Sequence, residues 1–73
     1  MDKKEIITNM CKRFHMELND EIINYLSNKI DDKEVLESSV TRLAALKTIF
    51  DKNELTLEDV KEYLNDFLIK RSN

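Results

Sequence analysis

The chain contains no glycine and no proline among its 73 residues, and this absence limits the ways in which it can turn. Glycine supplies left-handed turns and proline ends helices, so other residues must separate the elements. Asn and Asp are suited to this, because their side chains bond to nearby backbone groups and tolerate turn conformations. They cluster at three places, which divide the chain into four segments: Asn19-Asp20, Asp31-Asp32 and Asp51-Lys52-Asn53.

Each of the four segments has apolar residues at the spacing of an amphipathic helix. We therefore predict helices at about residues 2–15, 20–30, 32–50 and 57–69. No segment alternates apolar and polar residues with a period of two, so no sheet is expected. The short connections favour packing of neighbouring helices on one another. The prediction is an all-α fold, a small four-helix domain that occupies residues 1–73.

The apolar stripes of these segments predict one shared core. Cys11 falls within the first stripe and is interpreted as a small core residue, because no His or Cys partner shares its face. Asn19 or Asp20, Asp31 or Asp32, and Thr56 are the predicted N-caps, with Asp59 completing a capping box. The predicted core consists of Ile7, Met10, Phe14, Ile22, Leu26, Leu36, Val40, Leu43, Phe50, Val60, Leu64 and Phe67.

No pattern for covalent chemistry is found in the sequence. Without glycine there is no phosphate-binding loop and no EF-hand loop. Ser38 and Ser39 have no histidine placed to activate them. His15 has no second ligand at metal spacing, so it is interpreted as a surface or helix-end residue. We expect neither catalysis nor a bound metal or cofactor in this chain alone.

The formal net charge of −3 argues against DNA or an anionic membrane as the main partner. Basic residues lie near both ends and leave an acidic middle. No apolar run approaches the roughly 20 residues of a membrane span. One cysteine excludes an internal disulfide and fits a reducing compartment. We expect a soluble cytoplasmic protein that neither binds DNA specifically by itself nor enters a membrane.

The run DDKEVLESSVTRL at residues 31–43 and the run LTLEDVKEYL at residues 55–64 carry a family resemblance. With the NDEIINYL segment before them, they resemble the helical lid subdomain of the bacterial replication initiator DnaA, an AAA+ ATPase. The resemblance covers nearly the whole chain. The residues that fit the family pattern are Leu36, Glu37, Val40, Arg42, Leu55, Leu57, Val60 and Leu64.

The sequence departs from the family pattern where the family's lid senses nucleotide. When Asp32 is aligned with the signature's asparagine, Lys33-Glu34 replaces a valine-arginine pair and Ser38-Ser39 replaces glycine-alanine. The resemblance makes Glu34 the nucleotide-sensing position, at which the family has an arginine. A carboxylate there would repel a triphosphate.

The resemblance implies a lid that closes over ATP or ADP with Mg, held mainly by a separate P-loop domain. Its partners would be that domain or a neighbouring initiator subunit. The missing arginine favours a second hypothesis, a self-standing interaction module of a phage, plasmid or reduced genome that binds an initiator or another protein. A third is an unrelated four-helix domain. An upstream P-loop sequence would distinguish the first from the second.

Overall fold

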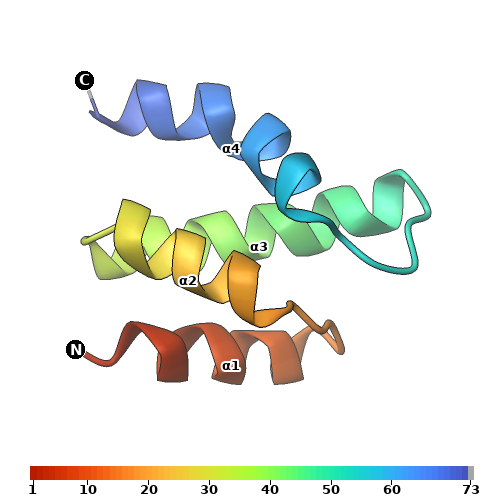
Figure 1. Cartoon of the computed structure of the whole chain (residues 1–73), viewed down its shortest axis with the longest axis horizontal. Helices are drawn as coiled ribbons and strands as arrows, with labels where there is room; N and C mark the ends of the chain where they lie inside the picture. The colour runs from red at the N-terminus through yellow and green to blue at the C-terminus, as the bar shows by residue number, and fades with distance from the viewer. Residues whose placement is uncertain (73) are drawn as a thin grey trace.

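The computed structural model describes the backbone of residues 1–72 and the side chains of residues 1–68. Within these residues it contains four helices and no strand. The helices are α1 (Lys3–Arg13), α2 (Asp20–Lys29), α3 (Lys33–Ile49) and α4 (Leu57–Ser72). Figure 1 shows α3 in the middle, α1 and α4 on opposite sides of it, and α2 across its front. The predicted all-α class and its four helices are therefore confirmed.

Each helix begins at a side chain that accepts a backbone hydrogen bond. Asn19 Oδ1 accepts from Ile22 N–H at 2.9 Å. At α4 the predicted capping box forms in both directions. Thr56 Oγ1 accepts from Asp59 N–H at 3.1 Å, and Asp59 Oδ2 accepts from Thr56 N–H at 3.0 Å. Asp2 caps α1 and Asp32 caps α3 in the same way. These caps satisfy N–H groups that a helix start leaves unpaired.

Two helices end at residues in the left-handed region, where glycine is usually found. His15 has φ 54° and Asp51 has φ 51°. His and Asp are among the residues that tolerate this conformation best. As a result α1 ends at Arg13, before the predicted end at residue 15, and α3 ends at Ile49. The end of α4 is the opposite case, since it extends past residue 69 to Ser72.

The core forms where the four helices meet. It includes Met16, Leu18 and Leu55, which were not predicted to be buried and which lie in the connections next to α1, α2 and α4. Phe14 and Phe67 are partly buried and pack against the core from its edge. The other buried apolar residues are Ile7, Met10, Cys11, Ile22, Leu26, Ile30, Leu36, Val40, Leu43, Val60 and Leu64.

Phe50 was predicted for the core and is instead 55% exposed. It is the C-cap residue of α3, and its N–H donates to the Leu46 carbonyl, while the N–H of Asp51, where the chain turns, donates to the Thr48 carbonyl. The helical spacing that predicted a buried Phe50 therefore does not apply to it, because α3 ends one residue earlier, at Ile49. Its ring stacks on Tyr63 of α4, with centroids 5.5 Å apart and planes 24° apart.

The α3–α4 connection is fixed by an ion pair. Lys52 Nζ lies 2.9 Å from Asp59 Oδ1, so Asp59, which completes the capping box of α4, also holds the loop before it. The hydrogen bond with Lys52 lowers the pKa of Asp59, and its counterpart raises the pKa of Lys52. Within residues 1–72, no helix has both the length and the apolar character needed to cross a membrane.

Candidate functional site: the groove along α3

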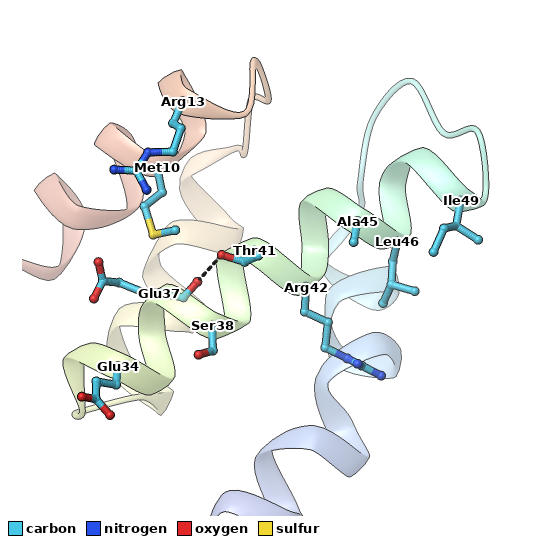
Figure 2. Close-up of a pocket in the computed structure, with 10 residues that line it drawn as sticks. All are labelled: Met10, Arg13, Glu34, Glu37, Ser38, Thr41, Arg42, Ala45, Leu46 and Ile49. Atoms are coloured by element: carbon cyan, nitrogen blue, oxygen red, sulfur yellow. Dashed lines mark hydrogen bonds between the residues drawn. The ribbon is translucent and has the colours of Figure 1, made fainter.

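The face of α3 between α1 and α4 forms an open groove of about 720 Å³. Five α3 residues run along it at helical spacing, and we call them the α3 stripe: Glu34, Ser38, Thr41, Ala45 and Ile49. Met10 and Arg13 of α1 form one wall (Figure 2). The stripe changes character along the helix, from acidic through small and polar to apolar.

Glu34 lies at the acidic end of the groove, in the first turn of α3. Its backbone N–H donates to Asp32 Oδ1 at 2.8 Å, which places it directly after the cap. Its side chain is exposed and lines the groove. Glu37 lines the groove one turn further on. Among the described residues neither carboxylate takes part in an ion pair, so both are available to a partner from outside the chain.

The two arginines of the groove differ in what they contact. Arg42 reaches across to α4, where its Nε–H donates to the Tyr63 carbonyl at 3.2 Å. Its guanidinium also lies 5.6 Å from the centre of the Phe67 ring. Arg42, one of the residues that fit the family pattern, therefore fastens α4 to α3. Arg13 extends from the α1 wall (Figure 2) and forms no ion pair within the described chain.

The other end of the groove is apolar. Ile49 is 69% exposed, Ala45 is exposed and Leu46 is partly covered. A large exposed aliphatic side chain beside other apolar groups is a common feature of a surface that receives a partner. The core prediction did not identify Leu46 or Ile49. The stripe could have been located from the sequence, because its residues follow helical spacing on the side of α3 opposite the core residues.

Ser38 and Ser39, which the resemblance aligns with a glycine-alanine pair, have different environments. Ser39 is buried, and its Oγ–H donates to the Val35 carbonyl at 2.7 Å. A small side chain is therefore needed at position 39, and its hydroxyl is satisfied within α3. Ser38 is partly exposed and lines the groove. Of the pair, only Ser38 can contact a ligand or partner in the groove.

A second cavity of about 670 Å³ lies between the end of α1 and the start of α2, beside Cys11 and His15. Burial raises the pKa of the Cys11 thiol, which keeps it protonated and unreactive. Cys11 is part of the hydrophobic core and His15 is an exposed residue at the end of α1. In the described part of the chain, no group of three or more His, Cys, Asp or Glu residues could hold a metal ion.

Comparisons with protein-family models, curated proteins and solved structures found no match to this chain.

Proposed function

We propose that the chain is the lid subdomain of a DnaA-like replication initiator ATPase in the cytoplasm. In this role it contributes to nucleotide-dependent closure and to assembly of initiator subunits at the replication origin. It is not catalytic alone. A separate P-loop domain would hold ATP or ADP with Mg, and the lid would cover that site or contact a neighbouring subunit.

The position of Glu34 is the observation that carries this proposal. The signature-like run becomes the cap and first turns of the long helix α3, with Leu36 and Val40 buried. Glu34 is left exposed at one end of the groove along α3. A residue in that place can face a nucleotide held by another domain, and the family resemblance assigns it that role.

Glutamate at this position changes what the lid can do. An arginine in the first turn could donate charge-assisted hydrogen bonds to phosphate, worth about 1.5–3 kcal/mol. Glu34 offers no donor and repels the triphosphate. Since Lys33 projects in another direction around the helix, it does not replace the missing arginine. The lid would therefore close without favouring ATP over ADP.

The proposal is tested by titrating the chain with the ATPase domain of a DnaA initiator from which the native lid has been removed. Calorimetry should detect a one-to-one complex with nucleotide present. No complex with ADP or ATP, under conditions in which the native lid rebinds, would overturn the lid proposal.

The absence of the sensing arginine favours a second candidate, a self-standing interaction module. In that case the groove would bind a surface of an intact initiator or of another protein, without covering a nucleotide. The same calorimetry distinguishes the two candidates. A module should bind the intact initiator, whose own lid is in place, and a replacement lid should not.

A further inference from the structure

We propose that the groove along α3 binds one amphipathic helix of a partner protein, with apolar residues at one end and basic residues at the other. The groove runs along α3 from Glu34 to Ile49, and its other lining residues belong to α1 (Figure 2). Helices commonly bind such grooves through side chains one turn apart. The inference extends the proposed function, since it names the partner element that the same surface takes, and it rests on the surface being an interface.

The charges of the groove determine the orientation of the partner helix. Glu34 and Glu37 have no ion pair within the described chain and form the acidic end. Arg13 projects from the α1 wall and would repel a basic side chain beside it. The partner's Lys or Arg residues are therefore confined to the Glu34 end. Basic residues are most favourable in the last turn of a helix, which makes the partner antiparallel to α3.

The apolar end of the groove would contact the first turns of the partner helix. Ile49 and Leu46 leave aliphatic surface exposed, and burying it under Leu or Ile of the partner's first turns removes that surface from water. Between the two ends the stripe carries only Ser38, Thr41 and Ala45. Their short side chains allow a second helix to approach closely along the middle of the groove.

The test uses the full chain and two alanine-based helical peptides. Both have leucines in the first turns, and the last turns carry arginines in one peptide and glutamates in the other. Amide chemical shifts of the ¹⁵N-labelled chain report where each peptide binds. The unmodified chain should bind the arginine peptide at least about tenfold more tightly than the glutamate peptide, with the shifts concentrated on the α3 stripe.

Charge-swap variants make this test specific. Glu34→Arg combined with Glu37→Arg should reverse the preference and favour the glutamate peptide. Ile49→Glu should weaken binding of both peptides. Glu62→Arg, on the exposed side of α4, and Thr48→Glu, next to Ile49 but outside the groove, should change neither preference nor affinity. Circular dichroism of each variant checks that the helices remain folded.

The inference would be overturned by no binding of either peptide, by equal binding of both, or by shifts that lie outside the α3 stripe. A dimer that sediments as such and is dissociated by Ile49→Glu would also overturn it, because a second copy would then occupy the groove. Binding of the arginine peptide without binding of the lid-less ATPase domain would support this inference and refute the lid proposal. The converse result would refute only the inference.

Discussion

Glu34 and Ile49 lie at opposite ends of α3 and line the same groove, one as a free carboxylate and the other as an exposed aliphatic side chain. Neither contributes to the core, which lies on the other side of the helix. The long helix therefore has two different faces. One face holds the domain together through Leu36, Val40 and Leu43, and the other lines the groove that we propose as a partner surface.

Leu43→Ala should lower the free energy of unfolding by about 2–5 kcal/mol, because Leu43 is fully buried and its truncation leaves a cavity. In a domain this small, such a loss threatens folding itself. Chemical denaturation followed by circular dichroism measures it. The exposed Ile49→Ala is the matched control, expected within about 0.5 kcal/mol of the unmodified chain. A Leu43→Ala loss below about 1 kcal/mol would mean that the core face of α3 is misplaced.

Thr56→Ala should cost about 0.5–2 kcal/mol, since it removes the acceptor of the Asp59 N–H at the start of α4. Thr48→Ala serves as its control. Thr48 lies inside α3, its hydroxyl donates to the Ala44 carbonyl of its own helix, and alanine has the higher helix propensity. Equal denaturation midpoints for the two variants would show that the capping box adds no stability.

Acid should destabilise the domain partly through Asp59, whose pKa is lowered by its hydrogen bond to Lys52. A carboxylate with a lowered folded-state pKa stabilises the fold above its ordinary value of 3.8 and loses that contribution as the pH falls. Because the pKa of Lys52 is raised, its contribution to stability is lost only at alkaline pH, above its ordinary pKa of 10.5.

Asp59→Asn keeps an acceptor for the Thr56 N–H and removes the charge. Its unfolding free energy should therefore fall less than that of the unmodified chain between about pH 5 and pH 2, and added salt should reduce the difference. Parallel stability curves for the two proteins over this range would exclude a contribution from the ion pair.

Arg42→Met should loosen α4 at a cost of about 0.5–1.5 kcal/mol, because it removes the hydrogen bond to the Tyr63 carbonyl and the contact with the Phe67 ring. Methionine retains most of the aliphatic stem. Hydrogen exchange should become faster in α4 and remain unchanged in α1. Arg13→Met is the control, and loss of protection in both variants alike would refute the fastening role of Arg42.

Sequence periodicity was sufficient to predict the helical class, the four segments and the capping box at Thr56, because each depends on neighbours a turn or less away. Long-range geometry was not predictable in this way. Met16, Leu18 and Leu55 are buried although they lie in connections, where no helical spacing marks them as core residues. Phe50 follows the helical spacing of the core residues and was wrongly predicted to be buried, because its exposure depends on the turn at Asp51 and on the position of Tyr63.

The candidate site was predictable in part for the same reason. The family resemblance singled out Glu34 through a local alignment of one helix turn; Glu34 lines the groove, and its role toward nucleotide stays a prediction. The apolar end at Leu46 and Ile49 depends on which face of α3 the other helices leave uncovered. Only the packing of α1 and α4 on either side of α3 shows that this face forms a groove.

The most direct test of the proposed lid function is calorimetric binding of the chain and its Glu34→Arg variant to the lid-less ATPase domain, with ATP and with ADP. The unmodified chain should bind no more tightly with ATP than with ADP, because Glu34 repels the additional phosphate. Glu34→Arg should strengthen binding with ATP by about tenfold or more, corresponding to about 1.4 kcal/mol, and leave binding with ADP less affected. Unchanged affinity of Glu34→Arg with both nucleotides would show that position 34 does not face the nucleotide, in contradiction to the proposal.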